Sequence, residues 1–357
     1  MPSSNVKYIG LDVHTEATTV AVRNAAGKLV MESIVETKAR RLLDLLEGMR
    51  GELHVTLEEG TWAEWLYDVL KPHVQEIVIC NPRRNALLKE GSKDDRVDAR
   101  KLSELLRTGM LRAVYHGQHG LRALRELVRS YEAVSKDVRR VMNRVKAIYR
   151  GWGIPCRGTQ VYSRRHREQW LEKIQETGVR RRAELFYQQL DALRDLRHTV
   201  RGELLVESRK HHAVKLLRQI PFIGPLRAAQ LVALMQTPHR FRSKRQLWTY
   251  SGLAVVTHDS GQYRYVNGQL QRSKKPQQVR GLNQNHNHMM KEIFKSAAES
   301  ASRRAAPFQD FYEGLLAKGM EPELARLTLA RKIAAITLTV WKKGESFDPR
   351  YVKPQAA

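Results

Sequence analysis

Apolar and polar positions alternate over short runs in residues 6–110, which predicts a mixed α/β domain. Three strand-like runs come first, separated by gaps of turn length, and helical and strand-like segments then alternate. The expected strands are 6–12, 17–24, 28–36, 53–58 and 76–80, and the expected helices are 37–49, 62–70 and 97–106. This order is typical of a ribonuclease-H-like domain. Actin-like sugar kinases share it, so the topology alone does not select a chemistry.

A long amphipathic pattern follows in the middle of the chain. Apolar residues recur every three or four positions from Leu121 through Val134 to Ile148, and arginine and lysine occupy much of the remaining helical surface. A glycine- and proline-containing stretch at 151–155 breaks the pattern, and a second helical stretch at 180–206 could run back along the first. We therefore expect a basic helical hairpin or coiled-coil arm.

The last third of the chain predicts a mainly α-helical domain. Residues 216–229 have the pattern of a helix, a tight turn and a helix, similar to a helix-hairpin-helix, whose glycine-rich turn binds phosphate through backbone amides. Phe222 stands where that turn usually has a second glycine, so a purely structural turn is an equally good interpretation. Further helices are expected over 289–303 and 326–343, followed by a frayed tail over 344–357.

These patterns divide the chain into four parts. We expect an α/β domain over 1–115, a basic helical linker over 116–210, a mainly α C-terminal domain over 211–345 and a tail over 346–357.

The charge balance indicates a polyanionic partner. Lysine and arginine number 63 against 37 aspartate and glutamate, a formal net charge of +26. Phosphates neutralised by such residues release condensed counterions, which favours nucleic acid. An anionic membrane would also attract this charge, but no apolar run approaches the roughly 20 residues that span a bilayer. Two distant cysteines, Cys80 and Cys156, fit a reducing cytoplasm, and we expect a nucleoid-associated protein with no membrane contact.

Four acids stand at the ends or starts of the expected elements. Asp12 ends the first strand, Glu58 ends the fourth, and Asp95 and Asp98 share one face of a helix's first turn. The first and fourth strands are neighbours in this topology, so the carboxylates can converge. Mg²⁺ or Mn²⁺ would suit such oxygen ligands, and two ions about 4 Å apart could clamp a transferring phosphate.

A simpler interpretation of these acids stays open. Asp95 and Asp98 favour a helix N-terminus whatever the function, and Glu58 could cap the following helix. Asp94 and Glu59 are adjacent candidates; Asp95 is preferred to Asp94 because it shares a helical face with Asp98.

The motifs around these acids carry a family resemblance. They read YIGLDVH over 8–14, EEG over 58–60, WLY over 65–67 and DRVDARKL over 95–102. Together they resemble the DEDD transposases of the insertion-sequence family known as bridge-RNA-guided recombinases, over residues 7–110 and 214–343. The resemblance implies a RuvC-like domain whose four acids match Asp12, Glu58, Asp95 and Asp98.

The resemblance also implies a serine nucleophile. In this family a pair matching Gly252-Leu253 is followed by a Ser-Gly whose serine attacks DNA, and Ser260-Gly261 occupies that place. Ser251 is a competing candidate, but it lies at what reads as a packed junction. Serine needs a base or a metal for activation, so Ser260 is expected to meet the acidic site of its own or another subunit. A phosphoserine link conserves the energy of the broken phosphodiester, which favours recombination.

Other polar residues carry weaker signals. Backbone contacts to nucleic acid are expected from Arg139, Arg140, Arg144, Lys146, Arg264, Lys274 and Lys275, although each could belong to a solvated basic surface. The loop over 283–288 contains two histidines, and a polar loop before a helix is a better interpretation than a metal site.

The sequence therefore predicts a DNA transposase or recombinase that cuts and rejoins donor and target DNA with Mg²⁺ or Mn²⁺. The resemblance adds a structured guide RNA and a homo-oligomer, a dimer or a tetramer. Three alternatives remain: a two-metal RuvC-like junction endonuclease, a non-catalytic nucleic-acid scaffold, and an actin-like phosphotransferase, which the basic charge and the missing glycine-rich nucleotide motif disfavour.

Overall fold

The computed structural model describes residues 5–82, 94–115, 119–257, 263–272, 279–304 and 307–352. Two compact units, residues 1–117 and 118–357, make up the chain. The four-part division expected from the sequence stays a prediction.

A five-stranded sheet forms the first unit. Its strands are β1 (Val6–Val13), β2 (Ala17–Asn24), β3 (Leu29–Glu36), β4 (Glu52–Glu58) and β5 (Glu76–Cys80), in the spatial order β3-β2-β1-β4-β5. The first three pair antiparallel, whereas β4 runs parallel to β1 and β5. The prediction that the first and fourth strands are neighbours is confirmed, and the mixed sheet is consistent with a ribonuclease-H-like fold.

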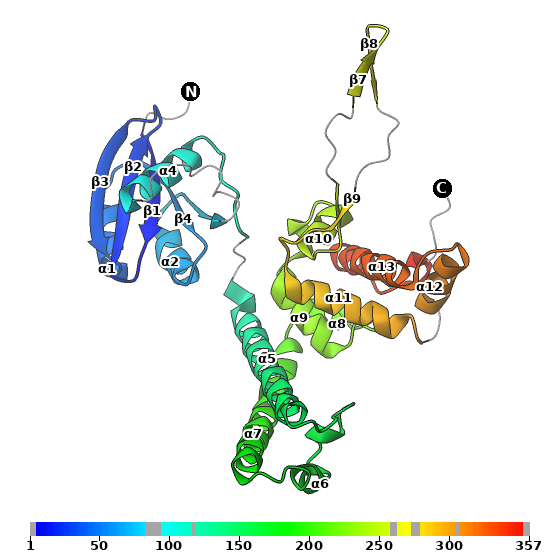
Figure 1. Ribbon diagram of the computed structural model, residues 1–357. Helices are drawn as coiled ribbons and strands as arrows, with labels where there is room; N and C mark the ends of the chain where they lie inside the picture. The colour runs from blue at the N-terminus through cyan, green and yellow to red at the C-terminus, as the bar shows by residue number, and fades with distance from the viewer. Residues whose placement is uncertain are drawn as a thin grey trace. The chain divides into compact units, whose positions relative to one another are not determined.

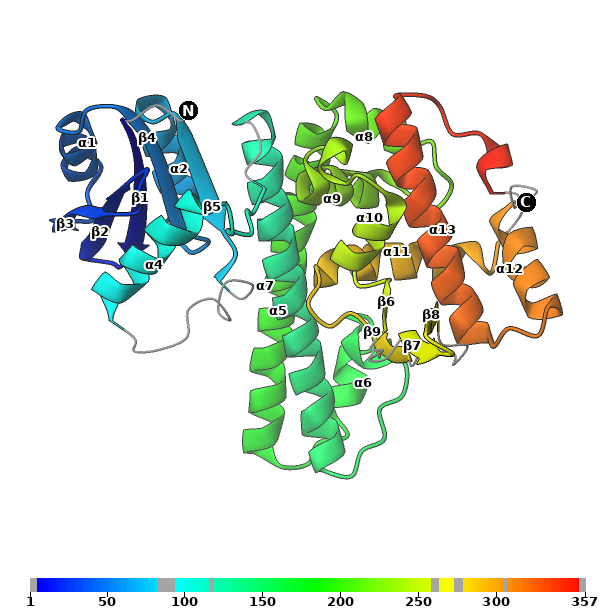
Figure 2. The same cartoon turned by 90° about the horizontal axis from the view of Figure 1, so that it is seen from above.

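Helices cover both faces of this sheet (Figures 1 and 2). Ile9 and Leu11 of β1 are buried in an apolar core with side chains of α1 (Ala39–Glu47) and α2 (Ala63–Leu70). The opposite face carries α4 (Asp95–Arg107), which lies directly on Gly10. A Cβ atom at Gly10 would clash with the Ala99 carbonyl oxygen and lie 2.6 Å from the Ser103 nitrogen. Glycine at this position therefore allows the helix backbone to touch the strand.

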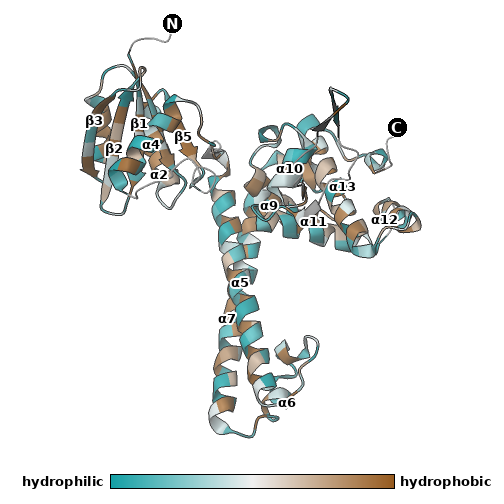
Figure 3. Cartoon of the chain, turned by 45° about the horizontal axis from the view of Figure 1, so that its top comes forward, coloured by the Kyte–Doolittle hydropathy of each residue, from teal (hydrophilic) through white to brown (hydrophobic). Residues whose placement is uncertain are grey.

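Two long helices begin the second unit. The helices α5 (Arg122–Gly151) and α7 (Thr177–Ser208) pack side by side, joined through the short α6 (Arg167–Leu171) (Figure 1). This confirms the predicted hairpin and the break after residue 151. Hydrophilic and hydrophobic residues alternate along both helices (Figure 3). The apolar stripe of α5 was expected to include Val134. In the structure Val134 is only half-buried, and the neighbouring Ser135 is buried instead.

One continuous helix, α5, contributes to two separate cores. Leu124 and Val128 belong to the core of the C-terminal helices. Three turns further on, Val138 and Val145 pack with Tyr187 of α7 in a second core.

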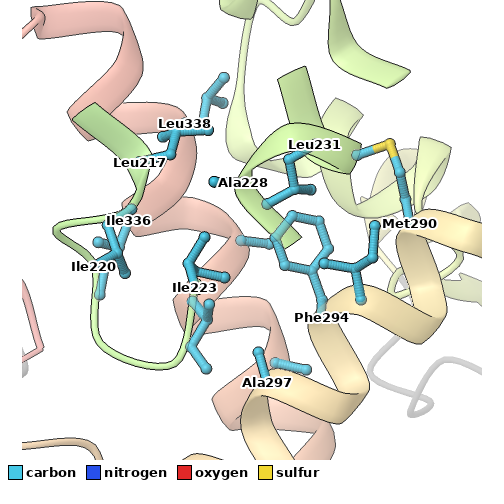
Figure 4. Packing of buried hydrophobic residues seen from close by; sticks show 14 of the residues in the cluster. Leu217, Ile220, Ile223, Ala228, Leu231, Met290, Phe294, Ala297, Ile336 and Leu338 are labelled. Atoms are coloured by element: carbon cyan, nitrogen blue, oxygen red, sulfur yellow. The ribbon is translucent and has the colours of Figure 1, made fainter. Parts of the chain in front are cut away.

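The remaining helices form a mainly α-helical domain, as expected. They are α8 (His212–Leu217), α9 (Pro225–Met235), α10 (Lys244–Tyr250), α11 (His288–Ala301), α12 (Phe308–Ala317) and α13 (Pro322–Lys343). Leu231, Phe294 and Ile336, from three of these helices, all belong to the core of this domain, which Figure 4 shows from close by. Two small strand pairs were not predicted: β6 (Val255–Thr257) with β9 (Val279–Leu282), and β7 (Tyr263–Val266) with β8 (Gln269–Arg272).

The tight turn between α8 and α9 forms as predicted, with an unusual residue in it. Phe222 adopts a φ of 67°, a conformation that normally favours glycine. Its ring contacts the buried Phe308 edge-on, with the ring centroids 6.2 Å apart. Phenylalanine thus keeps the glycine-like turn, and aromatic packing offsets its backbone strain.

The expectation of a frayed tail from residue 344 is wrong for its first part. Phe347 stacks on Phe308 with centroids 6.0 Å apart, and Val352 is buried in the same core. Apolar side chains hold this segment, and a short 3₁₀ turn over Pro349–Tyr351 lies between them. Residues 353–357 lie outside the described part of the chain.

In the part of the chain that the structure describes, no helix combines the length and apolarity needed to cross a bilayer.

Candidate metal centre and nucleic-acid interface

Asp12 owes its position to the alternation of side chains along β1. Gly10 faces α4, and successive residues of a strand point to opposite faces, so Asp12 lies on the same face as Gly10. Its side chain is only 18% exposed. The first carboxylate of the candidate site is therefore held on the face that α4 covers, close to the end of the strand.

The N-terminus of α4 supplies the next carboxylates. Asp94 is the N-cap residue, and its side chain accepts a hydrogen bond from the Arg96 backbone N–H at 3.2 Å. Asp95 and Asp98 then fall in the first helical turn. The Asp94 carboxylate already caps the helix, which is consistent with the choice of Asp95 over Asp94 as the candidate ligand.

Three side chains meet at this place. Donor atoms of Asp12, His14 and Asp95 all lie within 4.8 Å of one another. The His14 Nε2 atom is 3.3 Å from Oδ2 of Asp12 and 3.5 Å from Oδ1 of Asp95. His14 and Asp95 are 58% and 63% exposed, so the cluster opens to solvent on one side.

The electrostatics of this cluster centre on Asp12. Burial raises the pKa of Asp12, the neighbouring His14 lowers it, and the charges of Asp95 and Asp98 raise it further, with a net upward shift. Its ionised form is thus disfavoured in the absence of a counter-charge. A bound cation would remove that penalty.

Glu58 and Asp98 lie near this cluster but outside the group of three. Glu58 is the half-buried last residue of β4, and the register that pairs Leu11 with Leu57 sets it beside Asp12. Asp98 is close enough to influence the pKa of Asp12. The set of four acids as a metal site stays a prediction.

His14 was not predicted as a ligand from the sequence. The available signal was its spacing, since a residue two positions after Asp12 on an extended segment points the same way. The two carboxylates and one imidazole fit a divalent cation. Carboxylate oxygens suit both Mg²⁺ and Mn²⁺, whereas an imidazole nitrogen is a better ligand for transition metals than for Mg²⁺.

The four predicted nucleic-acid contacts on α5 differ in their surroundings. Arg140 pairs with Asp137 at 3.0 Å, and the Lys146 ammonium donates to the Gly158 carbonyl oxygen at 2.8 Å. Arg144 lies over the Phe186 ring, 5.9 Å from its centroid. Arg139 is exposed and forms no ion pair with the described residues. It is therefore the least engaged of the four.

Several predicted residues lie outside the part of the chain that the structure describes. Ser260, Lys274 and Lys275 lie outside the described residues, and only the backbone of Arg264, on β7, is described. The competing Ser251 is fully buried, and its hydroxyl donates to the Leu247 carbonyl oxygen at 2.7 Å. Ser251 is therefore part of a packed junction, as its sequence context predicted.

Gly252 beside it also has a structural role. Its φ is 65°, and a Cβ atom there would collide with the imidazole of His286. The histidine-containing loop thus packs directly on this glycine.

Two transposase family models match separate parts of the chain. The DEDD transposase model of IS110 matches residues 9–151, and the model of the IS116/IS110/IS902 transposase family matches residues 214–313. A curated relative, the insertion element IS116 uncharacterized 44.8 kDa protein of Streptomyces clavuligerus, is 24% identical over 156 residues. That match covers 44% of this chain but only 34% of the relative.

Proposed function

We propose that this chain, which matches two models of the IS110/IS116 group of insertion-element transposases, cuts and rejoins DNA at a divalent-metal site centred on Asp12. The observation that carries this proposal is the convergence of Asp12, His14 and Asp95 at the face of the sheet that α4 covers. The raised pKa of Asp12 supports it, because a half-buried carboxylate near two other acids is stabilised by a bound cation.

Asp12, Asp95 and His14 would hold the ion, with Glu58 and Asp98 as the remaining predicted ligands. Mg²⁺ or Mn²⁺ bound there would supply positive charge to a phosphate undergoing transfer. The side chains fix where that charge lies, because β1 and α4 are in backbone contact at Gly10.

We assign the nucleophile to Ser260 from its sequence context after Gly252-Leu253. Its Oγ atom attacks a backbone phosphorus, the Ser–O–P bond forms, and the bond from phosphorus to the neighbouring nucleotide's oxygen breaks. The serine proton passes to a base in the site, and the leaving oxygen takes up a proton. The phosphoserine link then allows a second DNA end to reverse the step without an external energy source.

The partners follow from the same proposal. DNA is the substrate, and a net charge of +26 supports a polyanion. A structured guide RNA and an assembly of several protomers are part of the proposal through the family resemblance.

Denaturing electrophoresis of DNA that carries the element's junction tests the chemistry. The full chain is incubated with this DNA, flanking RNA and Mg²⁺, beside Asp12→Ala and Ser260→Ala. We expect a protein-linked DNA band in the wild type and its loss in both variants. Free cleaved ends in Ser260→Ala would instead indicate a junction endonuclease that uses water. Scission that survives in Asp12→Ala would refute the metal site.

Neighbouring acids provide matched controls in the same assay. Glu58→Gln is expected to reduce scission strongly, because the register places it beside Asp12. Glu59→Gln changes an exposed acid one position along and should keep wild-type activity. Equal losses in the two variants would argue against a role for Glu58 as a ligand.

A further inference from the structure

The apolar stripe of α5 is interrupted where the helix passes from one core to the other. Glu132 and Ser135 occupy stripe positions between Val128 and Val138, which belong to the two cores. At this interruption a cavity of about 1110 Å³ opens among α5, α7, α9 and α11. A polar interruption that lines a cavity of this size is a candidate binding site.

The floor of the cavity holds polar groups from two helices. The Gln230 amide of α9, 6% exposed, donates to Oε1 of Glu132 at 2.6 Å. Ser135 is 8% exposed, and within the described residues its hydroxyl has no hydrogen-bond partner. Buried polar atoms in proteins are normally paired. An unpaired hydroxyl beside a carboxylate therefore points to a missing polar ligand.

The rim of the cavity is rich in cations. They are Arg139, Arg197, Arg227, Lys291 and Lys295. None of them forms an ion pair with any residue that the structure describes. Burial and the charge of Lys295 lower the pKa of Lys291, and burial lowers the pKa of Arg227. Cations that line one cavity are stabilised by anionic groups such as phosphates.

Apolar side chains line part of the walls, which also include the acids Glu292 and Glu299. Tyr131 of α5 and Met289 of α11 line the same cavity, beside the polar floor. An aromatic ring and a thioether are suitable surfaces for the face of a nucleobase. An acidic peptide would satisfy the rim, but it would bring further carboxylates against Glu132.

We propose that this cavity binds one unpaired nucleotide of a single-stranded nucleic acid, with its phosphates on the rim cations and its base edge on Glu132 and Ser135. A carboxylate accepts hydrogen bonds, so the base must present donors. Guanine presents two adjacent donors, its N1–H and its N2 amino group, to one carboxylate. Cytosine and adenine each offer one amino group there, and thymine and uracil offer one N3–H. Guanine is therefore the preferred base. The inference rests on the proposed function only in that the polymer is a nucleic acid.

Fluorescence anisotropy with labelled 12-nucleotide strands tests this proposal. The full chain is titrated, in EDTA, with oligothymidylate and with the same strand carrying one central guanine or one central adenine. Oligouridylate versions distinguish an RNA source from a DNA source. We expect roughly tenfold tighter binding of the strand with a central guanine. Glu132→Gln, which can keep the contact to Gln230, should remove that preference.

The rim is tested separately. Arg139→Ala combined with Lys295→Ala should weaken binding of every strand and lower the slope of log affinity against log salt by about 1.4. Arg129→Ala is the matched control, since this α5 cation pairs with Glu126 and lies outside the cavity. Thermal melting checks that each variant is folded.

Two results would overturn the inference. One is a base preference that survives in Glu132→Gln. The other is equal weakening by the rim variant and by Arg129→Ala. The binding assay contains EDTA and no metal, so either result would leave the proposed DNA cleavage at Asp12 standing. Loss of cleavage in Asp12→Ala would likewise leave the proposed nucleotide site standing.

Discussion

The acidic cluster of the first unit and the cationic cavity of the second are both polar sites on apolar scaffolds, but they are assembled differently. Asp12 and Glu58 come from adjacent strands whose register is fixed by backbone hydrogen bonds. The cavity combines side chains from four helices, and these side chains lie between Tyr131 and Glu299 in the sequence. Strand register allows the acidic cluster to be located from local sequence patterns. The cavity, in contrast, is formed only when the helices pack together.

The two sites also differ in what holds them. The acidic cluster depends on one close backbone contact, that of Gly10 with α4. The cavity depends on many side-chain contacts around an interrupted stripe. We therefore expect one added methyl group at Gly10 to disrupt the acidic cluster. Single substitutions around the cavity should each weaken that site only in part.

The largest effect is expected from Gly10→Ala. The added Cβ would lie 2.6 Å from the Ser103 nitrogen and against the Ala99 carbonyl, so α4 must move. We expect a loss of about 3 kcal/mol in the stability of the first unit, together with weaker Mn²⁺ binding. Denaturant unfolding and Mn²⁺ titration measure the two effects.

Gly48→Ala provides its control. Gly48 has a φ of −68°, and an added Cβ would meet its nearest atom at 3.5 Å. Stability should stay within about 1 kcal/mol of the wild type. A Gly10→Ala protein as stable as Gly48→Ala would show that α4 can move away from β1 at little cost in stability.

A smaller effect is expected from His14→Ala. The imidazole contributes a nitrogen ligand, so the Kd for Mn²⁺ should rise about tenfold, whereas the Kd for Mg²⁺ should change much less. Electron paramagnetic resonance of free Mn²⁺ measures the first, and competition with Mg²⁺ measures the second. His54→Ala, which removes a histidine paired with Glu76 at 2.8 Å, should leave both unchanged. Equal losses for the two metals would exclude selective coordination by His14.

Phe222 connects the tight turn to the cavity. Its carbonyl oxygen accepts a hydrogen bond from the rim residue Arg227 at 2.8 Å. Both Phe222→Ala and Phe222→Gly lose the contact with Phe308, but glycine also loses the strain of a φ of 67°. We expect the glycine variant to be more stable than the alanine variant by about 1 kcal/mol in urea unfolding. The opposite order would mean that the turn relaxes to an ordinary φ.

The smallest effect concerns the pH dependence of stability. Burial raises the pKa of Glu132 above its ordinary value of 4.5, Glu292 adds to the rise, and Arg139, Lys136 and the Gln230 hydrogen bond oppose it. The protonated form thus favours the fold below about pH 4.5, and this contribution is lost as the pH rises through the higher folded pKa. Glu132→Gln stays neutral, so its melting temperature relative to the wild type should increase from pH 4 to pH 8. A constant difference would contradict the raised pKa.

Local patterns predicted the elements of the sheet and the neighbouring first and fourth strands, because alternation and turn-length gaps are short-range signals. Two further short-range signals were present but not used. Asn267-Gly268, with φ values of 52° and 74°, forms the turn between β7 and β8, as this pair often does. His14 follows Asp12 at strand spacing.

Other features could not come from local patterns. The cavity requires α9 to pack against both α5 and α11, and this packing depends on contacts far apart in the sequence. Only the polar residues Glu132 and Ser135 within an apolar stripe marked its place. The packed tail likewise depends on Phe347 finding Phe308, which is 39 positions earlier in the sequence.

The long helix α5 also determines how the second unit unfolds. Its 30 residues extend for about 45 Å, and its two halves complete different cores. Neither core can melt without removing a wall of the other. The arm and the C-terminal helices therefore form a single cooperative block, so a ligand that stabilises one end raises the melting temperature of both.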